Sequence, residues 1–114
     1  MEITLNVTLN NNFSEFKVPV EESMLLIDLI FAIEGLMKTM VDDITTFDLY
    51  DVNFQRIALV SQEELFIAPE YKDIYTVLDL ESTTIEVIGL GKRSVSKVLQ
   101  EERDLLVALD NYEI

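Results

Sequence analysis

Two stretches at the start of the chain, residues 2–9 and 13–20, alternate between apolar and polar residues. The apolar positions are Ile3, Leu5, Val7 and Leu9 in the first stretch and Phe16, Val18 and Val20 in the second. A period of two is typical of a strand that buries one face. Asn10-Asn11-Asn12 follows the first stretch, and asparagine tolerates the left-handed backbone of tight turns. The first twenty residues therefore predict a β-hairpin.

From residue 24 to residue 41 the pattern becomes that of a helix, with 13 apolar residues in 18. Its narrow polar stripe consists of Asp28, Glu34, Gly35 and Lys38. At about 100° per residue they occupy about one third of the helix circumference. A helix that lies on one sheet needs a single apolar face, so we expect another element to cover the remaining apolar side.

Residues 45–50, 56–60 and 83–90 predict three further strands, and residues 61–71 predict an irregular segment. A short helical turn is expected within residues 73–80. Alternation in the first two of these strands places four side chains toward the core: Phe47, Leu49, Ile57 and Leu59. Together with the hairpin and the long helix, these elements predict an α+β domain with a mixed sheet of four to five strands.

Residues 94–109 predict a second helix, because apolar residues recur there at three- and four-residue spacing. They are Val95, Val98, Leu99, Leu105, Leu106 and Leu109. This apolar stripe could cover the exposed side of the first helix. Equally, both stripes could be buried in a homo-oligomer or against another protein. We therefore divide the chain into a domain of residues 1–91 and a C-terminal amphipathic helix within residues 92–114.

The order of the predicted elements resembles the β-grasp fold of ubiquitin. Three segments are also similar to ubiquitin in sequence: residues 1–5 open the first strand, residues 18–23 lead into the helix, and residues 75–87 run into the last strand. The resemblance implies a ubiquitin-like fold over about residues 1–90. Conjugation by a terminal Gly-Gly is not expected, because Gly89-Leu90-Gly91 is not such a pair and 23 residues follow it.

Within that superfamily the chain resembles the small ubiquitin-like proteins of bacterial type VII secretion systems, the YukD/EsaB group. The shared features are an acidic balance, Phe16-Lys17-Val18-Pro19 before the helix, and the Leu- and Ile-rich residues 25–30. This resemblance implies a cytoplasmic accessory or regulatory protein that acts by binding other proteins.

Composition removes most catalytic chemistry. The 114 residues include no cysteine, histidine or tryptophan. A thiolate nucleophile, a disulfide framework, a Ser-His triad and an imidazole metal ligand are all excluded. The acidic pairs, such as Asp42-Asp43 and Glu63-Glu64, are expected to be solvated surface charge, since neighbours in sequence point apart. Gly89–Ser94 lacks the spacing of a phosphate-binding loop. We expect a non-enzymatic protein that has no metal or cofactor.

The net charge of −14 restricts the partners. Residues 1–91 carry 17 acidic and 4 basic residues, a net −13, whereas residues 92–114 carry 5 and 4, a net −1. Such a surface repels nucleic acid and anionic lipid, and favours a basic protein partner. An alternative function is a phage-type inhibitor that mimics nucleic acid in the channel of a DNA- or RNA-binding enzyme. The charged residues within the long helix argue against membrane insertion.

Two groups of side chains are candidates for a partner-binding surface. Tyr50, Val52 and Phe54 fall on or beside the outer face of the third strand, and aromatic residues are enriched at binding hot spots. The stripe of the C-terminal helix supplies the second group, which consists of Val95, Val98, Leu99, Leu105 and Leu106.

Overall fold

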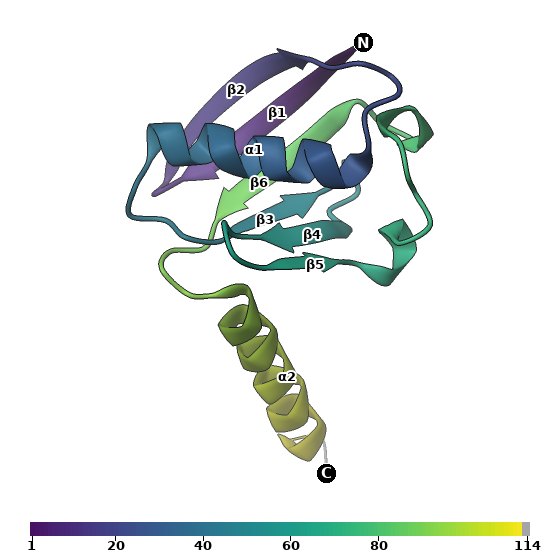
Figure 1. The fold of residues 1–114 in the computed structure, drawn as a ribbon. Helices are drawn as coiled ribbons and strands as arrows, with labels where there is room; N and C mark the ends of the chain where they lie inside the picture. The colour runs from purple at the N-terminus through teal and green to yellow at the C-terminus, as the bar shows by residue number, and fades with distance from the viewer. Residues whose placement is uncertain (113–114) are drawn as a thin grey trace.

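A single sheet of six strands forms the centre of the molecule, with strand order β2-β1-β6-β3-β4-β5. The computed structural model describes residues 1–112. Helix α1 crosses one face of the sheet, and helix α2 projects away from the body (Figure 1). The elements are β1 (Glu2–Leu9), β2 (Asn12–Pro19), α1 (Leu26–Met40), β3 (Phe47–Tyr50), β4 (Arg56–Val60), β5 (Leu65–Ile67), β6 (Thr84–Gly89) and α2 (Val95–Tyr112). The predicted α+β class is confirmed.

The N-terminal hairpin has the predicted form. Strands β1 and β2 pair antiparallel from Glu2 opposite Pro19 to Leu9 opposite Asn12. Asn10 and Asn11 make the turn with φ angles of 50° and 67°, a left-handed conformation that asparagine tolerates better than most residues. The other edge of β1 pairs in parallel with β6, the last strand. The first and last strands therefore lie side by side at the centre of the sheet.

The main core lies between α1 and one face of the sheet. Alternate residues of β1 face this core, and α1 contributes Leu26, Leu29, Ile30, Ile33 and Met37. Phe47, Leu49 and Ile57 are buried in the same cluster, as predicted. This core packs against one face of the sheet and so supports the elements that pack on the other face.

The prediction that Leu59 faces this core is wrong. Leu59 is buried in a second cluster, on the outer face of the sheet, together with residues of α2. The reason is a change of register: Leu49 pairs with Ala58 but Tyr50 pairs with Arg56, which leaves Ile57 between them. Such a β-bulge places two consecutive residues on one face. Ile57 and Ala58 thus both face the main core, and Leu59 faces away from it.

The expected number of strands, four to five, is also too low. The sixth strand is β5, which pairs antiparallel with β4. It lies within residues 61–71, a segment predicted to be irregular. Its three residues are too few to show an alternating pattern. Short 3-10 helices follow at Pro69–Tyr71 and Val77–Asp79, and the second of these is the helical turn predicted within residues 73–80.

Glu34 does not lie in a solvent-exposed polar stripe, contrary to the prediction. It is buried, and its Oε2 atom has no hydrogen-bond partner among the described residues. Glu34 lies four residues after Ile30 and three before Met37, so it shares their buried side of α1. Lys38, one turn away, donates instead to the carbonyl oxygen of Ile44.

Helix α2 does not cover the apolar side of α1, so the first of the two arrangements considered for its apolar stripe is wrong. The buried residues of α2, Val95 and Val98, pack against Leu59 on the opposite face of the sheet. The outer side of α1 stays exposed at Leu25, Ile27, Phe31 and Met40. Figure 1 shows α1 across one face of the sheet and α2 below the β5 edge, with the axis of α2 directed away from the body.

Two glycines provide a matched test of this packing. A Cβ atom on Gly89 of β6 would lie 2.7 Å from Cδ1 of Ile44, which is buried, whereas a Cβ on Gly35 of α1 meets nothing within 4 Å. We expect Gly89→Ala to lower the free energy of unfolding by about 1 kcal/mol through overpacking. Gly35→Ala should raise it by about 0.5–1 kcal/mol, because alanine favours the helix. Chemical denaturation of both variants measures the two signs, and a stabilising Gly89→Ala would contradict the packing described here.

Candidate functional site

At the junction between α2 and the outer face of the sheet, a small apolar cluster lies beside a network of hydrogen bonds and ion pairs. Val95 and Val98 are buried against Leu59 of β4, and Phe66, Leu90 and Leu99 pack around them. Complete burial of a valine side chain contributes about 1.5–3 kcal/mol. The first two turns of α2 therefore belong to the folded body.

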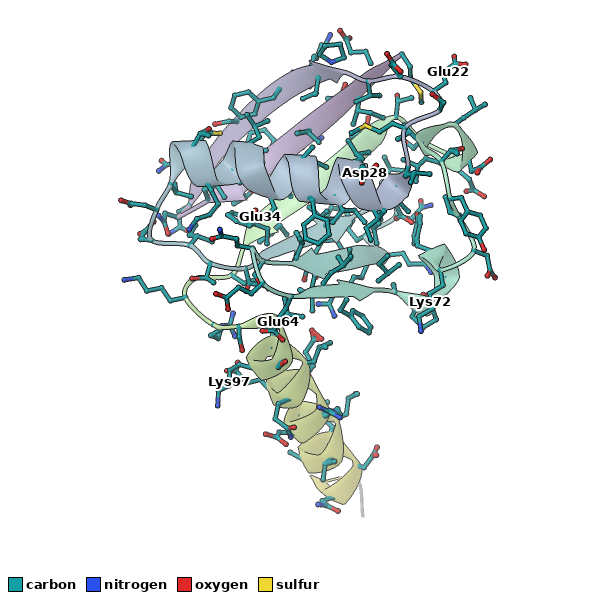
Figure 2. The ribbon with its side chains drawn as sticks, in the orientation of Figure 1. Glu22, Asp28, Glu34, Glu64, Lys72 and Lys97 are labelled. Atoms are coloured by element: carbon teal, nitrogen blue, oxygen red, sulfur yellow. The ribbon has the colours of Figure 1, made fainter. Side chains whose placement is uncertain are left out.

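Hydrogen bonds fix the start of α2. Gly91 has a φ of 80°, which reverses the chain after β6. The Thr46 hydroxyl donates to the carbonyl oxygen of Arg93, at 2.5 Å. The Ser94 hydroxyl oxygen accepts from the backbone N–H of Lys97, at 3.1 Å, which satisfies one of the free donors of a helix N-terminus. The Ser96 hydroxyl donates to the carboxylate of Glu64. Figure 2 shows Glu64 and Lys97 at this junction.

Arg56 connects the sheet to α2 through two bidentate contacts. Its Nε and Nη2 atoms donate to the carboxylate of Asp48 on β3, at 2.9 and 2.8 Å. Its Nη1 and Nη2 atoms donate to the carboxylate of Glu102 on α2, at 2.8 and 2.7 Å. The Tyr50 hydroxyl donates to Asp48 Oδ2 at 2.6 Å, and the Arg56 guanidinium lies 5.9 Å from the centre of the Tyr50 ring.

The Asp48 side chain is only 2% exposed, whereas those of Arg56 and Glu102 are 21% and 40% exposed. A buried carboxylate requires a partner because burial removes its hydration. Sequence analysis missed all three residues. Asp48 and Arg56 occupy positions that strand alternation assigns to a solvent-facing side, and the only sequence signal was an acidic residue flanked by Phe47 and Leu49.

The pKa values within this network follow from its contacts. Hydrogen bonds from Arg56 hold the pKa of Glu102 below its usual range. The carboxylates of Glu102 and Asp48 raise the pKa of Arg56, which stays charged. Burial, and then the hydrogen bond to Asp48, raise the pKa of Tyr50. The cluster is thus an arginine held between two carboxylates, an arrangement that fixes the position of α2 on the sheet.

The structure brings some of the predicted contact residues together. An open groove of about 410 Å³ lies between α2 and the sheet at the Arg56 cluster, whose side chains form part of its lining. Tyr50 from β3 and Val98 and Leu105 from α2 also line it. Tyr50 is half-buried there. It is part of the support of α2 and not of a free patch.

Val52 and Phe54 lie on the turn between β3 and β4. Asp51 shapes this turn, because its Oδ1 atom accepts from the backbone N–H groups of Asn53 and Gln55. Both apolar side chains are exposed, and Phe54 has a φ of 58°. Burial disfavours the ionised form of Asp51, but hydrogen bonds from Tyr71, Gln55 and Asn53 outweigh it and lower the pKa. Val52 and Phe54 are thus exposed on the turn, whereas Tyr50 lines the groove beside α2.

The distal part of α2 is exposed. Leu105, Leu106 and Leu109 are 60%, 62% and 52% exposed. They continue along the side of the helix that packs Val95 and Val98 on the body, since they follow at three-, four- and seven-residue intervals. An apolar stripe of this kind on a charged helix is typical of a surface that contacts another protein.

A second apolar surface surrounds α1. Besides the exposed residues of its outer side, a hollow of about 250 Å³ lies between α1 and the hairpin. Ile3, Val18, Met24, Ala32 and Leu36 are among the apolar side chains that line it. Ligand sites combine such a lining with a few placed polar groups, and the lining here contains only apolar side chains.

Within residues 1–112, no group of three or more Asp or Glu side chains is placed to hold a metal ion. No helix in this part of the chain is both long and apolar enough to span a membrane.

Comparison with known proteins adds no relative: no protein-family model matches the sequence, and no curated protein or solved structure matches it. The functional conclusion therefore depends on the geometry of this chain.

The buried ion pair predicts a large effect of one substitution. Arg56→Met leaves Asp48 buried without its cation, and we expect the free energy of unfolding to fall by about 3 kcal/mol. Arg93→Met is the matched control, because its partner Glu101 is exposed and such pairs contribute up to about 1 kcal/mol. Adding Asp48→Leu to Arg56→Met should recover most of the loss. Equal losses for the Arg56 and Arg93 variants in chemical denaturation would contradict this role of Asp48.

The lowered pKa of Glu102 predicts a pH dependence. The folded state favours the ionised carboxylate of Glu102. Its contribution to the free energy of unfolding is therefore complete above the unfolded pKa of about 4.3, and it is lost as the pH falls through the lower pKa of the folded state. We expect Glu102→Gln to lower the melting temperature at neutral pH and to match the unmodified chain near the acid limit.

Asp104→Asn serves as the control, since Asp104 accepts from Gln100 on the surface of α2. Its melting temperature should follow that of the unmodified chain at every pH. A difference between Glu102→Gln and the unmodified chain that does not change with pH would exclude the proposed ionic contact.

Proposed function

We propose that this chain is a non-enzymatic protein-binding module in which a ubiquitin-like β-grasp body holds α2 as a docking helix. One observation carries the proposal: the apolar stripe of α2 is buried on the body at Val95 and Val98 and exposed beyond it at Leu105, Leu106 and Leu109. A partner that covers the exposed part would extend a contact that the chain already makes with itself.

The arrangement of the body supports the β-grasp assignment. The first and last strands, β1 and β6, pair in parallel at the centre, a hairpin lies on one side and β3–β5 on the other, and α1 crosses one face. On the resemblance to type VII secretion proteins, the proposed setting is cytoplasmic and the partner is a component of a secretion machine. The charge of −13 on residues 1–91 favours a basic surface on a secretion component that contacts the body itself.

The rigid base of α2 supports its role as the docking element. Arg56 fixes Glu102, and Arg93 contacts Glu101 at 2.6 Å, so the helix leaves the body in a defined direction. A preorganised helix loses less conformational entropy on binding than a flexible tail. An apolar helix face laid into a groove is also a common mode of protein recognition.

Two variants of α2 test the proposal. Leu106→Asp places a charge in the stripe, whereas Val107→Asp places one on a neighbouring residue about 100° further around the helix, away from Val98 and Leu105. Val107 is 59% exposed, close to the 62% of Leu106, so neither change affects the core. In affinity capture from the source organism at matched bait levels, we expect Leu106→Asp to retain about a tenth or less of the partner and Val107→Asp to retain most of it.

Equal retention by the two variants would overturn the role of the α2 stripe. The salt dependence separates this function from nucleic-acid mimicry. Exposed charge pairs are screened within about 3 Å at 1 M salt, so a mimic would release its target there, whereas an apolar helix contact persists. Release of the partner at high salt together with competition by DNA or RNA would favour the mimic.

A further inference from the structure

We propose that the partner which covers the exposed stripe of α2 is a second copy of this chain, bound with its α2 antiparallel. The inference rests on the proposed function of α2 as a docking helix and names its occupant. Residues from Arg103 to Asp110 of each copy would meet around a two-fold axis. Along α2 this axis lies level with residues 106 and 107, on the side of the helix that carries Leu106 and away from the Val107 side chain. Leu105 would then contact Leu109 of the second copy, and the reverse.

The shape of the stripe supports an isologous contact. Leu105 and Leu109 are four residues apart on one side of the helix, with Leu106 beside them, and all three are exposed. An antiparallel pair about a two-fold axis buries each of these residues twice, once in each copy. The distal three turns of α2 otherwise project without tertiary packing (Figure 1), and helices of this length are marginal in water alone.

Charge on the flank of the stripe is complementary only in the antiparallel arrangement. Arg103 and Asp110 lie on the same flank of α2, seven residues apart, which is about two helical turns. Among residues 1–112, Arg103 donates a hydrogen bond only to the exposed Gln100, at 3.2 Å. An antiparallel pair centred near residues 106 and 107 places Arg103 next to Asp110 of the second copy, twice by symmetry. In a parallel pair in register the two copies of this flank lie on opposite sides of the contact, so Arg103 and Asp110 do not meet.

The charge of the body also selects this orientation. Residues 1–91 carry a net −13, so two bodies held side by side repel each other. The antiparallel pair places them at opposite ends of the helix pair, further apart than the Debye length of about 8 Å at physiological ionic strength. The contact is small, about three turns from each copy, so we expect a dissociation constant in the micromolar range or weaker.

Sedimentation equilibrium of the full chain, from micromolar to millimolar concentration, measures the association. We expect a monomer–dimer equilibrium that Val107→Asp preserves and Leu106→Asp weakens at least tenfold. Arg103→Asp and Asp110→Arg should each weaken it by about tenfold, since each replaces two attractive pairs by two repulsive ones. The double variant Arg103→Asp/Asp110→Arg should restore the original affinity.

Orientation is tested by disulfide formation, because the chain has no cysteine of its own. Leu105→Cys mixed with Leu109→Cys should form the mixed disulfide on mild oxidation. Each variant alone should form little, since identical positions are offset by about 6 Å along the axis. Together with the lateral separation of the two helices, this offset places their Cα atoms beyond the usual distance of a disulfide. Disulfides within each variant alone, without the mixed product, would show a parallel pair and overturn the inference.

Failure of this inference is distinguishable from failure of the proposed function. A chain that stays monomeric at millimolar concentration overturns the second copy as occupant, while loss of a captured partner by Leu106→Asp alone would still support α2 as a docking helix. Dimerisation that Leu106→Asp leaves unchanged would place the contact elsewhere, for example on the exposed side of α1. That result also overturns the inference.

Discussion

The contact of Arg56 with the carboxylates of Asp48 and Glu102 fixes the position of α2 on the body. Asp48 is buried on the outer face of the sheet and needs a cation, and Arg56 supplies it. The remaining donors of Arg56 then bind Glu102, one turn beyond the part of α2 that packs on the sheet. Because a planar guanidinium holds both partners in fixed geometry, the same contact sets the direction in which α2 leaves the body.

Stability and direction come from different residues at this junction. Burial of Val95 and Val98 against Leu59 supplies the favourable free energy of attachment. A partly buried ion network contributes little net stability, because desolvation offsets most of its Coulomb energy. Its effect is to exclude other orientations of α2. The result is a helix that presents Leu105, Leu106 and Leu109 away from a body of strongly negative charge, which is the geometry on which both proposals depend.

Local patterns predicted most of the elements. The hairpin, both helices, β4 and the last strand lie within two or three residues of their predicted bounds, because periods of two and of about 3.6 residues reflect backbone geometry that neighbouring residues share. The sequence pattern did not predict β5, because three residues are too few to show a period. Leu59 was assigned to the wrong face because a bulge at Ile57 interrupts the alternation, and a bulge leaves no mark in the hydrophobic pattern.

The sequence by itself determined where the chain is strand or helix, that α2 has an apolar stripe, and that chemistry based on cysteine or histidine is absent. Only the tertiary structure decided which face of the sheet each helix covers. Alternation separates two faces of a strand but does not say which neighbour packs on either one. Arg56 lies 8 residues from Asp48 and 46 residues from Glu102 in the chain. The three side chains meet because the sheet places β3 beside β4 and because Gly91 turns α2 onto the outer face.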